Sequence, residues 1–364
     1  MLNRQELLKH LDTLLQTSRF RDYCPNGLQV AGREHVSRIV TGVTANQALI
    51  DAAIAMDADT LLVHHGYFWK GEDARVTGIK KERLKALLAH DINLIAYHLP
   101  LDAHPVYGNN AQLADVLNLQ TDGLLNEADP ASVGNIGRLP RPMSGKEFCA
   151  WLGECLQREP LHIGEETDTI ETIAWCTGAA QSYLQLAVDA GIDAFLTGEI
   201  NEPAVHLARE TGTHFFSAGH HATERYGVKA LGEYLAAEYF VEQIVKEVPG
   251  LEVRPFSKSA LDCLLAYHWP GNVRDLKFAV ERAACMAQNL KIEAEDLPPE
   301  ILQDTPASSD EGFEAQTRAF ELGLLRRALH NTGWNQRKTA EILKLSYDQF
   351  RHLYRKYELD KEKP

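Results

Sequence analysis

Short apolar runs alternate with amphipathic stretches through roughly the first 235 residues of the chain. The apolar runs are rich in β-branched residues and predict strands at 38–43, 60–63, 93–97, 172–177, 194–196 and 214–217. The stretches between them have the spacing of helices with one buried face, at 47–56, 81–89, 181–190 and 202–211. This alternation predicts an α/β fold of βαβ units around a largely parallel sheet whose strands are buried on both faces.

The pattern changes after Tyr226. A helix is expected over 227–239, and two further helices at 256–265 and 273–287 flank a Trp-Pro-Gly-Asn turn. A segment rich in Asp, Ser, Thr and Pro follows, which is typical of a flexible linker, and 315–358 are helical again. We therefore expect a first domain over 1–239, an all-α segment over 240–303, a linker over 304–314 and a terminal domain over 315–364.

Length and composition agree with an intracellular protein of several domains. A chain of 364 residues favours two or three domains, and 45% hydrophobic with 24% charged residues is ordinary for globular proteins. No apolar run approaches the ~18 residues of a membrane span, so no membrane partner is expected. The six cysteines are scattered without a CxxC pair, which favours the reducing cytoplasm over a disulfide framework or a thiolate zinc site.

Charge is divided unevenly along the chain. The net charge is −14, but residues 321–364 contain ten Lys or Arg against six Asp or Glu. That balance of +4 means that the first 320 residues carry −18. An acidic body with a small basic tail predicts two partners of different kinds.

Histidines and carboxylates follow three of the predicted strands, at the ends where sites collect in open α/β sheets. A His and a Glu four residues apart on the helix after the last strand lie on one face and can reach one ion. Two adjacent histidines at the end of another strand point to opposite sides, so each would serve one of two neighbouring ions. The candidate metal ligands are His64, His65, Asp102, His220 and Glu224, and His98 lies near them in the sequence.

This set of side chains favours two divalent metal ions. Imidazole and carboxylate ligands suit zinc, iron, manganese, cobalt or nickel, whereas calcium prefers an all-oxygen shell. With Asp102 and Glu224 as the only anionic ligands, the loaded site carries about +2, which favours a small anionic substrate such as a phosphate ester or nucleotide. Each feature alone is more often a packed histidine or a solvated ion pair, but three together after three strands favour metal.

Six phrases of this region carry a specific resemblance. They are YCPNGLQV, VHHGYFWK, HLPLDAHP, GNNAQL, FLTGE and GHHATER, starting at residues 23, 63, 98, 108, 195 and 219. Residues 1–235 resemble the Nif3-like dinuclear metal-centre family, whose bacterial members are usually labelled type 2 GTP cyclohydrolase homologues. The resemblance implies a toroidal homo-hexamer with metal pairs facing an internal cavity, and as ligands His64, His65, Asp102, His220 and a bridging Glu224.

One departure from the family concerns the end of the metal domain. Members usually end in a short strand of the type Asp-Ile-Pro-Asn-Pro, and that ending is absent here. The segment 250–255 is the candidate substitute for this edge strand.

The basic tail has the pattern of a helix-turn-helix. Helices are expected over 336–343 and 347–357, capped by Asn335 and Ser346, and Phe350 belongs to the buried side of the second. Such a helix can lie in the major groove of DNA, whereas the alternative is a small helical bundle with a solvated charged face. The candidate DNA contacts are Tyr347, Gln349, Arg351, His352, Arg355 and Lys356.

A second resemblance covers the C-terminal part. Residues 256–287, with the phrase YHWPGNVRDLK from residue 267, resemble the ATPase lid of sigma-54-dependent activators, and 321–359 resemble their Fis-type DNA-binding domain, closest to the phage-shock activators. The chain contains neither a GxxxxGK[ST] phosphate loop nor a GAFTGA loop, so no ATP-driven promoter opening is expected. The join near 235–241 indicates a fusion of two genes or an assembly artefact.

Two functional hypotheses follow. The first is a metal-dependent hydrolase in which a metal-bridging hydroxide attacks a small phosphorylated or nucleotide-like substrate, with Glu199 and His98 as candidates for proton transfer or support of the ligands. The second is a DNA-binding transcriptional regulator without ATPase activity that uses the acidic domain for oligomerisation or sensing.

Overall fold

The computed structural model describes residues 2–129, 131–239, 256–267 and 279–303 (the last without 281, 285, 288 and 290), and nine single residues between 329 and 354. The described residues fall into two compact units, one formed by those up to 239 and one by those from 256 onward. None of the described helices is long and apolar enough to cross a membrane.

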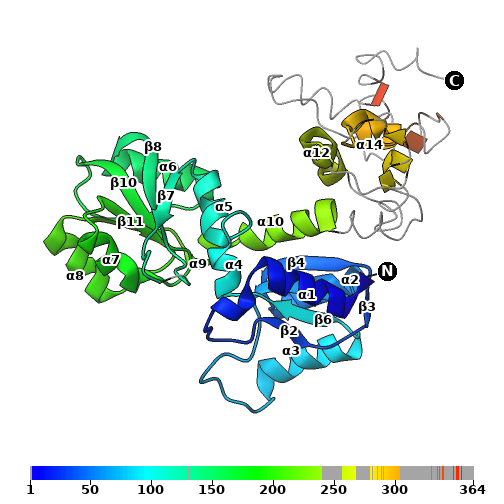
Figure 1. The fold of residues 1–364 in the computed structure, drawn as a ribbon, viewed down its shortest axis with the longest axis horizontal. Helices are drawn as coiled ribbons and strands as arrows, with labels where there is room; N and C mark the ends of the chain where they lie inside the picture. The colour runs from blue at the N-terminus through cyan, green and yellow to red at the C-terminus, as the bar shows by residue number, and fades with distance from the viewer. Residues whose placement is uncertain are drawn as a thin grey trace. The chain divides into compact units, whose positions relative to one another are not determined.

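A four-stranded sheet forms the first half of the first unit (Figure 1). Its order is β2-β6-β5-β4, in which β4, β5 and β6 are parallel and β2 is antiparallel to β6. Gly42 on β4 faces Leu49 of α2, whereas the adjacent Thr41 faces Gly232 of α10, so these helices cover opposite faces. The bounds are α1 Arg4–Leu14, β2 Gly27–Val30, β4 Ile39–Thr44, α2 Gln47–Ala55, β5 Thr60–His65, α3 Gly78–Ala89, β6 Asn93–Ala96 and α10 Gly227–Tyr234.

A six-stranded sheet forms the second half, in the order β7-β8-β10-β11-β12-β9. The central strands β10, β11 and β12 are parallel, and β7, β8 and β9 pair antiparallel with their neighbours. The bounds are β7 Gln120–Leu124, β8 Asn135–Ser144, α6 Gly145–Leu156, β9 Leu161–Ile163, β10 Thr169–Trp175, α7 Leu184–Asp189, β11 Ala194–Thr197, α8 Glu202–Thr211 and β12 His214–Ser217.

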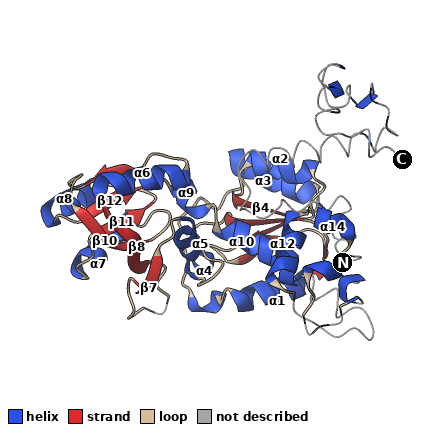
Figure 2. Cartoon of the chain, turned by 90° about the horizontal axis from the view of Figure 1, so that it is seen from above, coloured by secondary structure: helices blue, strands red, loops and turns tan. Residues whose placement is uncertain are grey.

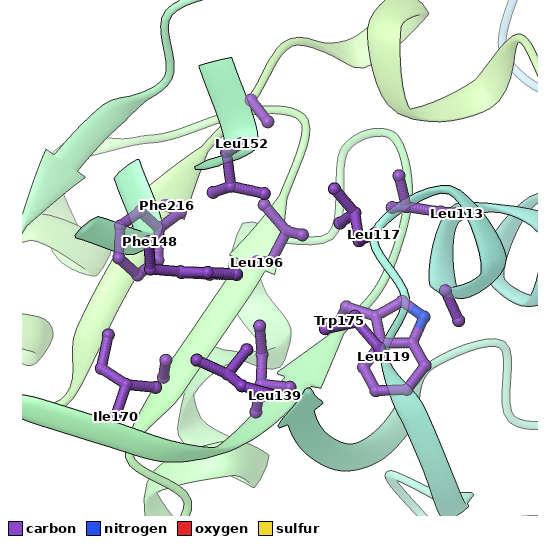
Figure 3. Packing of buried hydrophobic residues seen from close by; sticks show 14 of the residues in the cluster. Leu113, Leu117, Leu119, Leu139, Phe148, Leu152, Ile170, Trp175, Leu196 and Phe216 are labelled. Carbon is purple, nitrogen blue, oxygen red and sulfur yellow. The ribbon is translucent and has the colours of Figure 1, made fainter. Parts of the chain in front are cut away.

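The two faces of this sheet are covered by different helices. Trp175 on β10 packs with Phe148 and Leu152 of α6 in one apolar cluster (Figure 3). The adjacent Ala174 points the other way and packs with Leu184 of α7 in a second cluster, because successive strand residues alternate between faces. In Figure 2, α6 and α7 accordingly lie on opposite sides of the β10–β12 strands.

The α/β class and all six predicted strands are confirmed, but the expectation of one largely parallel sheet is wrong. Both sheets are mixed, and the antiparallel strands β2, β7, β8 and β9 were not expected. The reason is visible in β8, where Leu139 and Met143 are buried while Pro140 and Pro142 are exposed. A strand that alternates between core and solvent gives no continuous apolar run.

Short helices bring the ends of both sheets together within the first unit. These are α4 Leu99–Ala103, which follows β6, α5 Asn109–Val116, and α9 His220–Glu224, which follows β12. Helix α5 contacts α4, α9 and α10, so these connections form one packed group (Figure 1). Residues at the carboxyl ends of the parallel strands therefore meet here, as expected for α/β sheets.

The second unit is described in part. It contains α12 Lys258–Ala266, η4 Ala294–Asp296 and α14 Pro299–Gln303, and α12 confirms the helix expected over 256–265. The expected edge strand at 250–255, the Trp-Pro-Gly-Asn turn and the linker at 304–314 lie outside the described residues.

Candidate metal centre

The five expected ligand residues lie together in the first unit. His64 and His65 end β5, Asp102 lies in α4, and His220 and Glu224 are the first and last residues of α9. Their ligand atoms form two groups, each with atoms within 4.8 Å of one another. One group is His64, Asp102 and Glu224, and the other is His65, His220 and Glu224.

Glu224 belongs to both groups through different oxygens. Its Oε1 lies 3.6 Å from His64 Nε2, while its Oε2 lies 3.3 Å from His65 Nε2 and 3.0 Å from His220 Nε2. His64 Nε2 also lies 3.5 Å from Asp102 Oδ1. The carboxylate thus lies between two sets of nitrogen and oxygen donors, as a bridging ligand would.

Three of these separations, 3.3, 3.5 and 3.6 Å, fit ligands around a cation better than hydrogen bonds, whereas the 3.0 Å between His220 and Glu224 is compatible with either. Ligands about 2.1 Å from a tetrahedrally coordinated ion lie about 3.4 Å apart, whereas N–H···O hydrogen bonds fall near 2.9 Å. Glu224 Oε2 is buried and accepts no hydrogen bond of good geometry, although His220 Nε2 is near it. A buried carboxylate oxygen without a hydrogen-bond partner is costly, and a metal ion would satisfy it.

The other ring nitrogens orient the three imidazoles. His64 Nδ1 lies 2.9 Å from the Tyr97 carbonyl oxygen, and His220 Nδ1 lies 2.7 Å from Glu199 Oε1. Because both partners are acceptors, each Nδ1 carries the proton and donates it, which leaves Nε2 with the lone pair that a metal requires. His65 Nδ1 has the Thr44 hydroxyl at 3.3 Å.

Asp102 is held by residues whose roles the sequence did not reveal. Asn109 Nδ2 donates to Asp102 Oδ1 at 2.9 Å, and Thr177 Oγ1 donates to the same oxygen at 3.3 Å. Asn109 Oδ1 in turn accepts from the Gly227 amide at 2.9 Å, so it ties α5 to α10. Asn109 lies in the GNNAQL phrase, which was the only signal available.

The charges of the cluster depend strongly on one another. Burial lowers the pKa of His64, but the negative charges of Asp102 and Glu224 outweigh it and raise that pKa to about 9. The pKa of His220 also rises to about 9, chiefly because the Glu224 carboxylate lies beside its ring. Burial and the nearby His64 charge lower the pKa of His65 to about 3. The buried carboxylates therefore keep His64 and His220 protonated and positively charged. Divalent ions would replace these protons as the positive charge beside the carboxylates.

A glycine makes room for the shared carboxylate. Gly178 has φ +70°, and a Cβ at this position would collide with Glu224 Oε1. The Gly178 amide donates to the Thr223 hydroxyl at 3.1 Å, which fixes this loop against α9. The close approach and the left-handed backbone both require glycine here.

His98 and Glu199, which were expected to transfer protons or to support the ligands, lie beside the cluster. The ring of His98 is 5.1 Å from that of His64, and its Nδ1 lies 2.7 Å from Asp22 Oδ1. Glu199 contacts the cluster through the Nδ1 atom of His220. Asp22 was not anticipated, because it precedes a family phrase and follows no predicted strand.

The cluster opens into a pocket of about 820 Å³. Aromatic side chains of Tyr23, Trp69 and Tyr183 line it together with His65, His98, His220 and Glu224. The indole of Trp69 meets the His98 ring edge-on at 5.0 Å between centroids. A small molecule can therefore approach the candidate ligands between aromatic walls.

The expected DNA contacts are described only in part. Tyr347 and Arg351 are exposed, with the guanidinium 5.9 Å from the tyrosine ring centre, while Phe350 is buried as expected. Gln349, His352, Arg355 and Lys356 lie outside the described residues.

Comparison with known proteins identifies the family. Residues 2–249 match the sequence model described as Duf34/NIF3 (NGG1p interacting factor 3). The chain belongs to this family. A relative from Pseudomonas aeruginosa named GTP cyclohydrolase 1 type 2 homolog is 53% identical over 243 residues, which are 67% of this chain and 96% of the relative. One of the same name from Neisseria meningitidis serogroup A is 51% identical over 259 residues, 71% and 99% of the two chains.

Solved structures support the fold of the same region. One described as "protein ybgI, unknown function" is 48% identical with a TM-score of 0.61, and the match covers 64% of this chain and 93% of that one. A protein from Thermus thermophilus is 35% identical with a TM-score of 0.59, covering 65% and 95%. The Nif3-like α/β fold expected from the sequence is thereby confirmed.

A second match covers the region after the family domain. Residues 234–312 match the sequence model of an AAA+ ATPase lid domain. The match is to the lid class as a whole, and the assignment to a sigma-54 activator with a Fis-type domain stays a prediction.

Proposed function

We propose that residues 1–239 form a dinuclear metal domain that hydrolyses a small phosphorylated or nucleotide-like substrate. The observation that carries the proposal is the position of Glu224, whose two buried oxygens face two different groups of ligand atoms. His64 and Asp102 complete one group, and His65 and His220 complete the other. The metals that suit such ligands are zinc, iron, manganese, cobalt and nickel.

Two ions held by these residues would supply hydroxide at neutral pH and neutralise charge that develops on substrate oxygens. The protein's own part is to hold the ligands rigidly and to move protons. The Tyr97 carbonyl and Glu199 hold Nδ1 of His64 and His220, which would leave Nε2 of each ring free to bind an ion. His98 is oriented by Asp22 and lines the same pocket, and it is our candidate for donating a proton to the leaving group.

The substrate class follows from charge and shape. Asp102 and Glu224 offset only part of the charge of two divalent ions, so the loaded site carries about +2 and attracts anions. The aromatic side chains of Tyr23, Trp69 and Tyr183 in the same pocket suit a planar ring such as a nucleobase. The relatives' name, GTP cyclohydrolase 1 type 2 homolog, agrees with a nucleotide-like substrate.

The proposal extends to assembly and to the tail. We propose a homo-hexamer for the family domain, followed by a lid-type helical segment at 240–303, a linker at 304–314 and a terminal domain at 315–364. The AAA+ lid match supports the helical segment, and the exposed Tyr347–Arg351 pair agrees with the outer face expected for the second helix of a Fis-type domain. No observation on the described residues favours DNA binding over the metal function.

The deciding experiment is elemental analysis combined with light scattering on protein purified without added metal. Wild type is expected to contain about two transition-metal ions per chain in a hexamer. Glu224→Ala should lose both ions, because both groups share this carboxylate. Glu233→Ala is the matched control, since Glu233 lies on α10 and pairs with Lys229 at 3.7 Å.

Activity is tested on the same samples with a panel of phosphate esters and nucleotides. Wild type and Glu233→Ala are expected to hydrolyse at least one of these compounds. Glu224→Ala should not, and adding metal should not restore its activity. A wild-type protein without transition metal would contradict the proposal at its first step.

A further inference from the structure

Helix α3 places two long cationic side chains on its inward face. One face of the helix is formed by residues spaced three or four apart, namely Lys80, Arg83, Leu84 and Leu87. Both leucines are buried against the four-stranded sheet. Lys80 is also largely shielded, with a side chain only 14% exposed. An inward-facing charge is costly unless a partner of opposite charge lies near it.

Lys80 has such partners. Its Nζ lies 3.1 Å from Glu72 Oε1, donates to the Asp73 carbonyl at 3.2 Å, and sits 5.3 Å from the centre of the Phe68 ring. The charge of Lys80 is therefore satisfied within the protein.

Arg83 has no such partner among the described residues. Its Nε is buried and makes no hydrogen bond, and no described carboxylate forms an ion pair with its guanidinium. Its positive charge reaches Tyr67, which lines the same pocket: burial raises the pKa of Tyr67 to about 12, and Arg83 offsets part of that rise. Arg83 is thus a half-buried cation without an ionic partner among the described residues.

Arg83 lines the same pocket as the candidate metal ligands. His65, Asp102, His220 and Glu224 line this pocket too, and Glu72, the nearby acid, is already paired with Lys80. An anion that neutralises the charge of Arg83 would therefore have to bind in this pocket. A planar guanidinium pairs best with an oxyanion that accepts two parallel hydrogen bonds, such as phosphate.

We propose that Arg83 is the residue that binds a phosphate group of the substrate, at a distance from the reacting bond. The inference rests on the proposed function, because that function supplies the phosphorylated substrate. Its test is independent of that function, since it measures phosphate binding and needs no turnover. Arg83 is a binding and specificity residue, and the ions and His98 remain the candidates for chemistry.

The first test measures binding of inorganic phosphate by isothermal titration calorimetry at fixed ionic strength, on protein as purified and with metal content determined for every sample. Arg83→Met should weaken binding roughly tenfold or more, the loss expected for a charge-assisted pair. The phosphate affinity of Arg83→Lys should lie between those of wild type and Arg83→Met, because lysine keeps the charge but cannot donate two parallel hydrogen bonds. Arg75→Met is the control, since Arg75 is exposed and already paired with Asp73 at 2.7 Å.

The second test separates ligand binding from a structural role. Removing an unpaired cation from an inward face should leave the Tm of Arg83→Met equal to or above that of wild type, whereas a structural arginine would lower it. Phosphate should raise the Tm of wild type and Arg75→Met but not of Arg83→Met.

Three results would overturn the inference: equal phosphate affinity in Arg83→Met and wild type at equal metal content, a lowered Tm with an intact phosphate response, or acetate binding as tightly as phosphate at the same ionic strength. Failure of the proposed function looks different. In that case no phosphorylated compound is hydrolysed, while the phosphate affinity still depends on Arg83.

Discussion

His220 and Glu199 are joined through Nδ1 and Oε1 at 2.7 Å, on the side of the imidazole that faces away from Glu224. Glu199 follows β11 and His220 begins α9, so this contact links two neighbouring strand ends of the six-stranded sheet. A carboxylate in this position raises the basicity of the ligating nitrogen and fixes the ring.

Glu199→Gln should therefore weaken the binding of one metal ion and spare the other. The affinity of the group formed by His65, His220 and Glu224 is expected to fall roughly 10–100-fold, because the amide still accepts the Nδ1 proton but carries no charge. Competition with a chelator, followed by elemental analysis, should show one ion lost early and one retained.

The control for this substitution is Glu202→Gln, which removes the charge of a nearby acid whose exposed side chain pairs with His206 at 3.7 Å. Equal chelator resistance of wild type and Glu199→Gln would mean that Glu199 does not support a ligand.

Gly178→Ala should remove metal, whereas Gly191→Ala should not. The two glycines have nearly the same backbone, φ +70° and +69°, so each substitution costs about 1 kcal/mol of folding stability for the left-handed conformation. Only at Gly178 does the new methyl group collide with Glu224, while nothing lies within 4 Å at Gly191. Urea unfolding and metal analysis of both variants check this, and equal metal content in the two would contradict it.

The sequence predicted the parts of the site that follow buried strands. His64, His65, His220 and Glu224 could be placed because a continuous apolar run precedes them, and such a run fixes both the strand and its end. The pairing of His64 and His65 with different oxygens of Glu224 agrees with the period-2 expectation for adjacent strand residues.

Residues that act through long-range contacts could not be predicted in this way. Asp22 is 76 residues from His98 in the chain, and Asn109 joins Asp102 to Gly227, which is 118 residues away from Asn109. No local periodicity encodes such pairings. The antiparallel strands were missed for a related reason, because their partners rather than their own apolar content define them.

His98→Gln should leave two metal ions bound, whereas His65→Gln should lose at least one. His98 uses Nδ1 to contact Asp22, and its expected task is proton transfer. Hydrolysis by His98→Gln is therefore expected to fall roughly 10²–10⁴-fold without loss of metal. Elemental analysis and kcat for the proposed substrates test the two parts separately, and metal loss in His98→Gln would instead identify His98 as a ligand.

A histidine pair outside the candidate metal cluster predicts how stability depends on pH. His162 Nε2 lies 3.0 Å from His214 Nδ1, and the two rings stack at the β9–β12 edge of the six-stranded sheet. Burial lowers the pKa of both, and the charge of His214 lowers that of His162 further. The folded protein therefore resists protonation at this pair.

The sign of the effect follows from proton uptake. Below about pH 6.5 the unfolded chain binds protons that the folded pair excludes, so the free energy of unfolding should decrease as the pH falls through and below 6.5. Urea unfolding of wild type at pH 5 and pH 7.5 should show this loss, and the double variant His162→Gln/His214→Gln should show a smaller one. The exposed His206 provides the control, since His206→Gln should keep the wild-type difference. A double variant with an undiminished loss would place the acid sensitivity elsewhere, because the histidines of the candidate metal centre are the same in all three proteins and cancel in the comparison.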